Sequence, residues 1–76
     1  MEELLRSLVE PLVKHPEDIN IRQVEGERAI ILELRVHPED MGRVIGKGGK
    51  RAQAIRAIMK AKGNAMDERI LLDIVD

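Results

Sequence analysis

Glycine and basic residues gather in one stretch of this 76-residue chain, which reads Arg43-Val44-Ile45-Gly46-Lys47-Gly48-Gly49-Lys50-Arg51. Glycine has no Cβ, so it can adopt positive φ and lets the backbone of another molecule approach closely. Lysine and arginine add N–H donors and positive charge. A turn of this composition ahead of a helix is suited to holding a phosphate group against protein backbone. The sequence therefore predicts an anion-binding loop in this stretch.

Two common phosphate-binding motifs do not fit. The P-loop requires a lysine followed by serine or threonine, but Lys47 precedes Gly48 and Lys50 precedes Arg51. The dinucleotide-binding motif Gly-x-Gly-x-x-Gly would begin at Gly46, but its last glycine is replaced by Arg51. The pattern that fits is Val-Ile-Gly-x-x-Gly, whose loop clamps four backbone nucleotides in KH-type domains. The alternative is a glycine-rich turn between two helices with incidental cations.

The distribution of charge favours a polyanionic ligand. The net charge is only −1, but residues 43–62 contain seven cations and no acid, whereas the rest of the chain has six cations against fourteen acids. A basic segment on an acidic body would orient a polyanion and keep it off the remaining surface. The alternative, a solvated helix face, explains the cations but not the absence of acids among them.

Composition narrows the chemistry further. The chain has no Phe, Tyr, Trp or Cys, so bases cannot stack on such rings, and disulfides and thiolate metal sites are excluded. Any RNA bases would lie on aliphatic side chains, and we expect modest affinity. With Ser7 as its single serine and no arranged acid–base pair, the chain is not expected to be an enzyme or to carry a cofactor. The tetrapeptide His-Pro-Glu-Asp occurs at 15–18 and 37–40, where it is more typical of a helix-starting turn than of a metal site, and no metal is expected.

Hydrophobic periodicity predicts the elements that must position the loop. A stripe of apolar residues predicts a helix over 2–14, with Pro11 loosening its last turn. Residues 19–25 and 28–36 are predicted to form an antiparallel hairpin, turning where Gly26 can adopt positive φ. A short helix beginning at His37-Pro38 is expected to end at Gly46.

A second helix is predicted to begin after Gly49 and to run to about Lys62, and residues 69–75 should form a last strand. Gly63-Asn64 is a plausible helix stop, and the predicted inner face of the helix comprises Ala52, Ile55, Ile58 and Met59. The last strand lies far enough from the second strand for parallel pairing. We therefore predict one α+β domain over 1–76, with a three-stranded mixed sheet and all helices on one face.

Several phrases of the sequence resemble those of a known family. The order α-β-β-α-α-β, the run from Val44 to Gly49 between two helices, and Ala52 beyond it resemble a type II KH domain. The chain is similar over its whole length to the small bacterial single-KH RNA-binding proteins of the KhpA/YlqC type, through the phrases HPED, VEGER, LELRV, PEDMGRVIGKGGKRAQAIR and DIVD.

The resemblance implies a function and a site. It implies a protein that binds short single-stranded RNA as an RNA chaperone or post-transcriptional regulator, linked in some bacteria to cell elongation and division. The clamp would be formed by Gly46, Lys47, Gly48 and Gly49. The implied aliphatic groove comprises Val44, Ile45, Ala52 and Ile55, and the flanking cations are Arg43, Lys50 and Arg51.

The resemblance also implies partners. Members of the family form homodimers, or heterodimers with a larger multidomain KH-containing protein of the Jag/KhpB type. A protein-interaction module that dimerises through the same loop and groove is therefore the alternative to an RNA-binding protein. The sequence has no apolar run long enough to span a bilayer, and its charged first residues are not typical of a signal peptide. We expect a cytoplasmic protein with no membrane partner.

Overall fold

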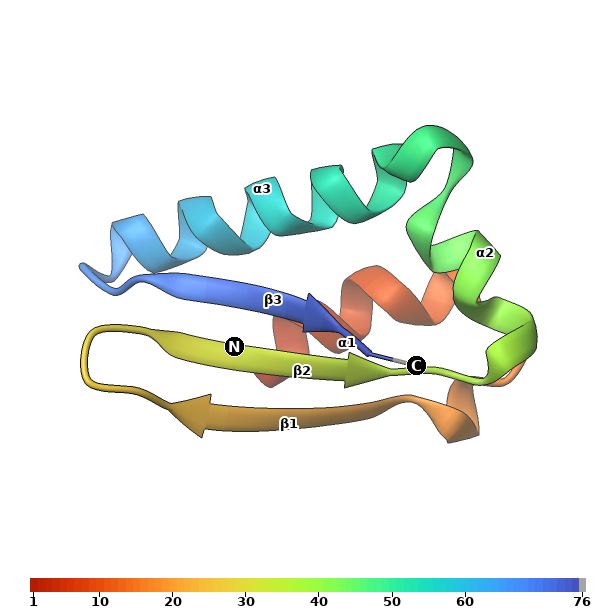
Figure 1. Ribbon diagram of the computed structural model, residues 1–76, viewed down its shortest axis with the longest axis horizontal. Coiled ribbons are helices and arrows are strands. Elements are labelled where there is room, and N and C mark those ends of the chain that lie inside the picture. Colours follow the sequence, from red (N-terminus) through yellow and green to blue (C-terminus); the bar gives the residue numbers. More distant parts are fainter. Residues whose placement is uncertain (76) are drawn as a thin grey trace.

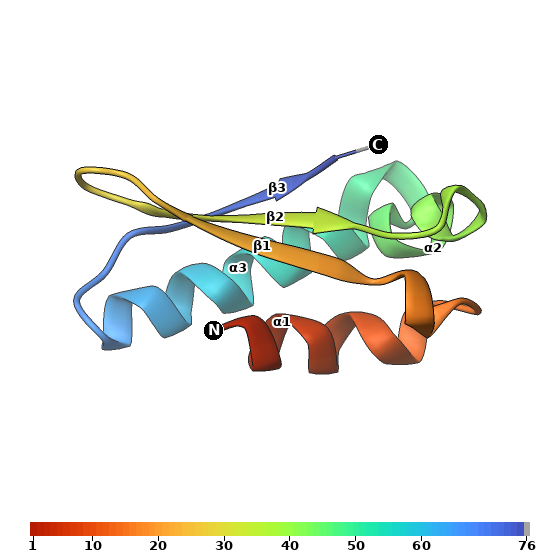
Figure 2. The ribbon, with the colours of Figure 1, turned by 90° about the horizontal axis from the view of Figure 1, so that it is seen from below.

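A three-stranded sheet forms one layer of the molecule in the computed structural model, which describes residues 1–75. Its strands are β1 (Asn20–Glu25), β2 (Ile30–Arg35) and β3 (Ile70–Ile74), in the spatial order β1-β2-β3. Strands β1 and β2 pair antiparallel, and β2 and β3 pair parallel, with Ile30 opposite Ile70. Figure 2 shows helices α1 (Glu2–Val9) and α3 (Lys50–Ala65) together on one side of this sheet. The predicted fold class, a mixed three-stranded sheet with helices on one face, is confirmed.

The N-terminal helix changes character where proline enters it. Helix α1 ends at Val9 and is followed by the 3-10 turn η1 (Glu10–Leu12), which contains Pro11. Proline lacks the N–H that would continue the α-helical ladder, so the predicted loosening of the last turn is confirmed. A second 3-10 turn, η2 (Pro16–Asp18), leads into β1.

The crossover from β2 to β3 contains the glycine-rich stretch. It runs through the 3-10 turn η3 (Pro38–Asp40), the short helix α2 (Met41–Ile45), the turn η4 (Lys47–Gly49) and the long helix α3. In Figure 1, α2 lies beyond the end of β2, and the chain then turns back so that α3 runs alongside β3. The glycine loop therefore lies at one end of the molecule.

The end of α3 differs from the prediction. The helix does not stop at Gly63 but continues to Ala65, and Asp67 makes the following turn with φ 57°. Gly63 is buried, and a Cβ on it would lie 2.6 Å from the backbone oxygen of Glu68 and 2.9 Å from Cγ1 of Ile70. Glycine is needed there because the returning chain passes very close to the helix.

Aliphatic side chains fill the space between the sheet and the helices. The buried core comprises Leu5, Val9, Ile19, Leu32, Leu34, Val44, Ile55, Met59, Ile70 and Leu72. Two further expectations were wrong. Ile58 is 44% exposed because it lies one residue away from the buried stripe of α3. Within residues 1–75, Gly26 is not among the residues with positive φ, and its N–H instead closes the hairpin by donating to the Ala29 carbonyl at 2.8 Å.

No helix within residues 1–75 is both long enough and apolar enough to cross a bilayer.

Candidate nucleic-acid interface

The Gly-x-x-Gly loop is a tight turn between two helices. Helix α2 ends where Gly46 adopts φ 76° and ψ 173°, and the Gly46 N–H donates to the Gly42 carbonyl at 2.9 Å. Gly48 (φ 64°, ψ 20°) and Gly49 (φ 78°, ψ 9°) follow in the left-handed region, and the Gly49 N–H donates back to the Gly46 carbonyl at 3.1 Å. All three glycines thus have a backbone conformation that other residues rarely adopt.

The glycines differ in what surrounds them. A Cβ on Gly46 would lie 2.8 Å from Cγ and 2.9 Å from Cβ of Arg51, so this glycine is packed against the protein itself. At Gly48 and Gly49 a Cβ would meet no heavy atom of residues 1–75 within 4 Å. The backbone of the last two glycines is therefore open to another molecule.

Helix α3 begins directly at this open backbone. Gly49 is its N-cap residue, and within the described residues of this helix its first turn has neither an acidic residue nor a side-chain cap. The first N–H groups of a helix have no intrahelical partner, and the helix dipole gives that end a partial positive charge. The N-terminus of α3 thus adds to the positive potential beside the loop.

The four cations of the 43–51 stretch differ in whether their side chains have partners within the protein. Arg43 donates from Nη1 to Oδ1 of Asp40 at 3.2 Å, and Arg51 donates from Nη1 to the carbonyl oxygen of Arg43 at 2.9 Å. Lys47 and Lys50 are exposed, and no hydrogen bond or ion pair joins their side chains to residues 1–75. The two lysines are therefore available to a ligand, whereas the two arginines are hydrogen-bonded within the protein.

The aliphatic residues expected to form a groove are mostly covered. Val44 is completely buried, and Ala52 and Ile55 are 4% and 5% exposed, because α2 and α3 turn these side chains toward the core. Ile45 is 37% exposed, next to the loop. Of the four aliphatic residues named from the sequence, only Ile45 offers appreciable surface in this structure.

A buried aspartate, missed in the sequence analysis, fixes the start of α2. Asp40 is completely buried, and its two carboxylate oxygens accept the backbone N–H groups of Lys14 at 3.0 Å and His15 at 2.9 Å. Desolvation by burial on its own raises the pKa of Asp40, but these two hydrogen bonds and the Coulombic interactions with His15 and Arg43 outweigh it, so the pKa lies below its usual value. Asp40 thereby joins α2 to the connection between α1 and β1.

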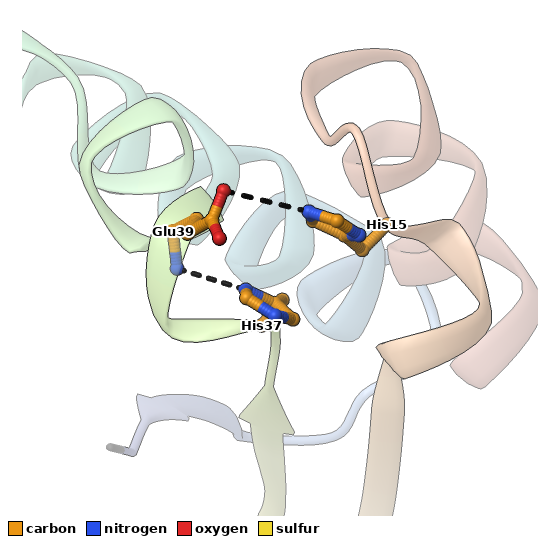
Figure 3. Close-up of side chains that lie close together, drawn as sticks. All are labelled: His15, His37 and Glu39. Atoms are coloured by element: carbon orange, nitrogen blue, oxygen red, sulfur yellow. Dashed lines mark hydrogen bonds and ion pairs between the residues drawn. The ribbon is translucent and has the colours of Figure 1, made fainter.

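The two His-Pro-Glu-Asp runs contact each other beside Asp40. The rings of His15 and His37 stack with centroids 4.0 Å apart and planes 23° apart, and Figure 3 shows Glu39 beside both. Nδ1 of His37 accepts the N–H of Glu39 at 3.0 Å, and Nε2 of His15 lies 3.7 Å from Oε2 of Glu39.

These three side chains are close enough to suggest a metal site, but their geometry argues against one. A metal ion lies near the plane of each imidazole that binds it, and stacked, nearly parallel rings cannot both point at one ion. The Nδ1 lone pair of His37 already accepts the N–H of Glu39, so this nitrogen is not available to an ion. We interpret the stack as a structural contact between two turns.

Comparison with known proteins places the chain in a family. A family model described as "KhpA/KhpB, KH domain" matches residues 2–74. The chain is 49% identical over 76 residues to "RNA-binding protein KhpA" of Listeria monocytogenes, covering 100% of both chains. It is 45% identical over 75 residues to the protein of the same name from Clostridium perfringens, covering 99% of this chain and 100% of the relative.

A solved structure agrees on the fold. The crystal structure of a single-residue variant of Aquifex aeolicus Era, bound to GDP and aluminium fluoride, superposes with a TM-score of 0.64 at 19% identity, over 95% of this chain and 28% of that one. At this identity the likeness concerns the fold alone. On the match of the family model and the identity to its relatives, the chain belongs to the KhpA/KhpB family of KH domains, which is not a family of enzymes.

Proposed function

We propose that this protein binds single-stranded RNA through the loop formed by residues 46–49. The observation that carries the proposal is the open backbone of Gly48 and Gly49, held at positive φ between two unpaired lysines and beside the N-terminus of α3. Relatives that match the whole chain bear the name RNA-binding protein, which supports RNA as the ligand.

The binding mode follows from the chemistry of the loop. The sugar-phosphate chain would lie on the Gly48–Gly49 backbone, with Lys47 and Lys50 compensating phosphate charge and the first N–H groups of α3 donating hydrogen bonds. Bases would extend over Ile45 and be read at their Watson–Crick edges. Without Phe, Tyr or Trp, the site lacks the ~1–3 kcal/mol per base that aromatic stacking provides, so we expect modest affinity.

A double substitution tests the site. We expect Lys47→Asp with Gly48→Asp to abolish binding of a fluorescent single-stranded RNA in an anisotropy titration. The variant should still fold, since Asp tolerates left-handed φ better than most residues and a Cβ at Gly48 meets open space. The matched control is Arg6→Asp with Ser7→Asp, which makes the same charge change on exposed positions of α1. Equal affinity in the two variants would refute the assignment of the loop.

Salt dependence provides a second test. Each phosphate contact to a single strand contributes a slope of about −0.7 to the dependence of log K on log salt. Contacts to the two lysines therefore predict a shallow slope of about −1.4. A slope corresponding to about ten contacts would indicate a different surface.

The cellular role is proposed from the family. We propose that the protein acts in the cytoplasm as an RNA chaperone or post-transcriptional regulator linked to cell elongation and division. A KhpB-type protein is the proposed heterodimer partner, because a single family model covers the KH domains of KhpA and KhpB. Crosslinking in cells, followed by sequencing of the bound transcripts, would identify the RNA targets.

A second candidate function is dimerisation through the same end of the molecule. It is favoured by Ile45, whose apolar side chain is 37% exposed next to the loop and would be covered by a partner protein. Analytical ultracentrifugation with and without RNA separates the two functions. A stable dimer that RNA dissociates would mean that both use one surface, and a dimer unaffected by RNA would place the protein contact elsewhere.

A further inference from the structure

One contact joins the two helices that border the loop. A short α-helix leaves its last carbonyl groups without intrahelical partners, and α2 has only five residues. The carbonyl of Gly42 accepts a hydrogen bond from the Gly46 N–H. The next carbonyl, that of Arg43, accepts a hydrogen bond from Nη1 of Arg51 at 2.9 Å. Arg51 belongs to the first turn of α3, so its side chain reaches back across the loop to cap α2.

The stem of the same side chain contacts the loop itself. The place where Gly46 lacks a Cβ lies 2.8 Å from Cγ and 2.9 Å from Cβ of Arg51. Arg51 therefore passes over the first glycine of the loop on its way to α2. Gly48 and Gly49, on the far side of the turn, remain open.

We propose that Arg51 is a positioning residue, which holds the 46–49 loop in its binding conformation without contacting RNA; this inference rests on the proposed function. Glycine has more conformational freedom to lose than any other residue, and three of the four loop residues are glycines. A five-residue helix is also far too short to be stable alone. The hydrogen bond from Arg51 to Arg43 restrains both the loop and α2, because it fixes the distance between the end of α2 and the start of α3.

The inference differs in a measurable way from the expectation that Arg51 flanks the RNA as a cation. A residue that contacts phosphate contributes to the salt dependence of binding, and one that only positions the loop does not. If loss of the restraint leaves the binding conformation populated for only part of the time, the apparent affinity falls by that fraction while the contacts themselves are unchanged.

The test compares Arg51→Met with Lys50→Met in the full chain, using one fluorescent single-stranded RNA across a series of salt concentrations. Methionine keeps the aliphatic stem against Gly46 and removes only the guanidinium. We expect Arg51→Met to weaken binding about threefold to tenfold with an unchanged salt slope, and Lys50→Met to weaken binding with a slope shallower by about 0.7. The hydrogen-bonded backbone amides of Gly49 and Lys50 should exchange with solvent faster in Arg51→Met than in Lys50→Met.

Three results would overturn the inference: unchanged affinity in Arg51→Met, a slope reduced as in Lys50→Met, or unchanged amide exchange. A purely structural role would lower thermal stability but leave the affinity of the folded protein intact. If the unmodified protein binds no RNA, the proposed function fails, whereas the exchange measurement still decides whether Arg51 restrains the loop.

Discussion

Replacing Gly46 with alanine should destabilise the protein more than the same change at Gly49. At φ 76° and ψ 173°, Gly46 occupies a region that is essentially restricted to glycine, and a residue with a Cβ there costs on the order of 1–3 kcal/mol. The new Cβ would also lie 3.0 Å from the backbone nitrogen of Arg51 and 2.8 Å from its Cγ. Moving Arg51 away would break its hydrogen bond to Arg43, at about 0.5–1.5 kcal/mol. The total for Gly46→Ala is about 2–4 kcal/mol.

Gly49→Ala is the matched control. Gly49 has φ 78° and ψ 9°, where alanine costs about 1–2 kcal/mol, and its Cβ would meet open space among residues 1–75. Alanine also restricts the unfolded chain, which returns about 0.4–1 kcal/mol equally in both variants. Urea unfolding followed by circular dichroism, with a slope of about 1 kcal/mol/M for a domain of this size, should separate the two midpoints by about 1–2 M. Coincident midpoints would refute the steric reasoning about Gly46.

Three other substitutions test the frame around the loop. Gly63→Ala should lower the melting temperature, because its Cβ would lie 2.6 Å from a backbone oxygen. Gly42→Ala, with open space around the new Cβ, should raise the melting temperature, because alanine favours a helix over glycine by ~0.5–1 kcal/mol. A shift of the same sign in both variants would contradict this. Asp40→Asn should be less stable than the unmodified protein at neutral pH and should lose less stability on acidification. Because the pKa of Asp40 is lowered in the folded state, the carboxylate stabilises the fold at pH values above its unfolded-state pKa. This stabilisation is lost as the pH falls through the folded-state pKa. Parallel pH–stability curves would disprove it. His37→Leu should cost about 1 kcal/mol by removing the acceptor for the Glu39 N–H, and His37→Asn, which retains an acceptor, should cost less in the same thermal melts.

The fold was predictable because its main signals are local. The alternation from Ile30 to Val36 and the apolar stripe of α1 are periodicities that survive in the structure, and proline and glycine mark where elements change. The error at Gly63 arose where the chain turns back onto its own helix. A glycine at position 63 suggests the end of a helix, but glycine is required there because the backbone of Glu68 passes close to it. The sequence pattern around Gly63 does not predict that approach.

The backbone conformation of the candidate site was predictable from the sequence, but the different roles of its side chains were not. Three glycines in four residues predict positive φ, and the structure has it at all three. From the sequence, Lys47 was assigned to the clamp, and Arg43, Lys50 and Arg51 were all assigned to its flanks as potential RNA contacts. Only the fold distinguishes them, because the partners of the two arginines are a buried carboxylate and a carbonyl on neighbouring elements.

The repeated tetrapeptide shows how far context decides the role of a residue. Asp18 and Asp40 end identical His-Pro-Glu-Asp runs and both close 3-10 turns, yet Asp18 is exposed and Asp40 is completely buried. The two aspartates differ in burial because their turns face different parts of the chain. Asp40 accepts hydrogen bonds from the N–H groups of Lys14 and His15, which lie at the start of the 15–18 run.

A chain of contacts therefore connects the loop to the rest of the domain. The connection between α1 and β1 holds Asp40, Asp40 holds Arg43, and the carbonyl of Arg43 holds Arg51 at the start of α3. Each step restrains an element too short to be stable by itself. In the proposed binding mode, the open glycines present their backbone to RNA in a defined conformation, because the ends of the loop are held by hydrogen bonds within the protein.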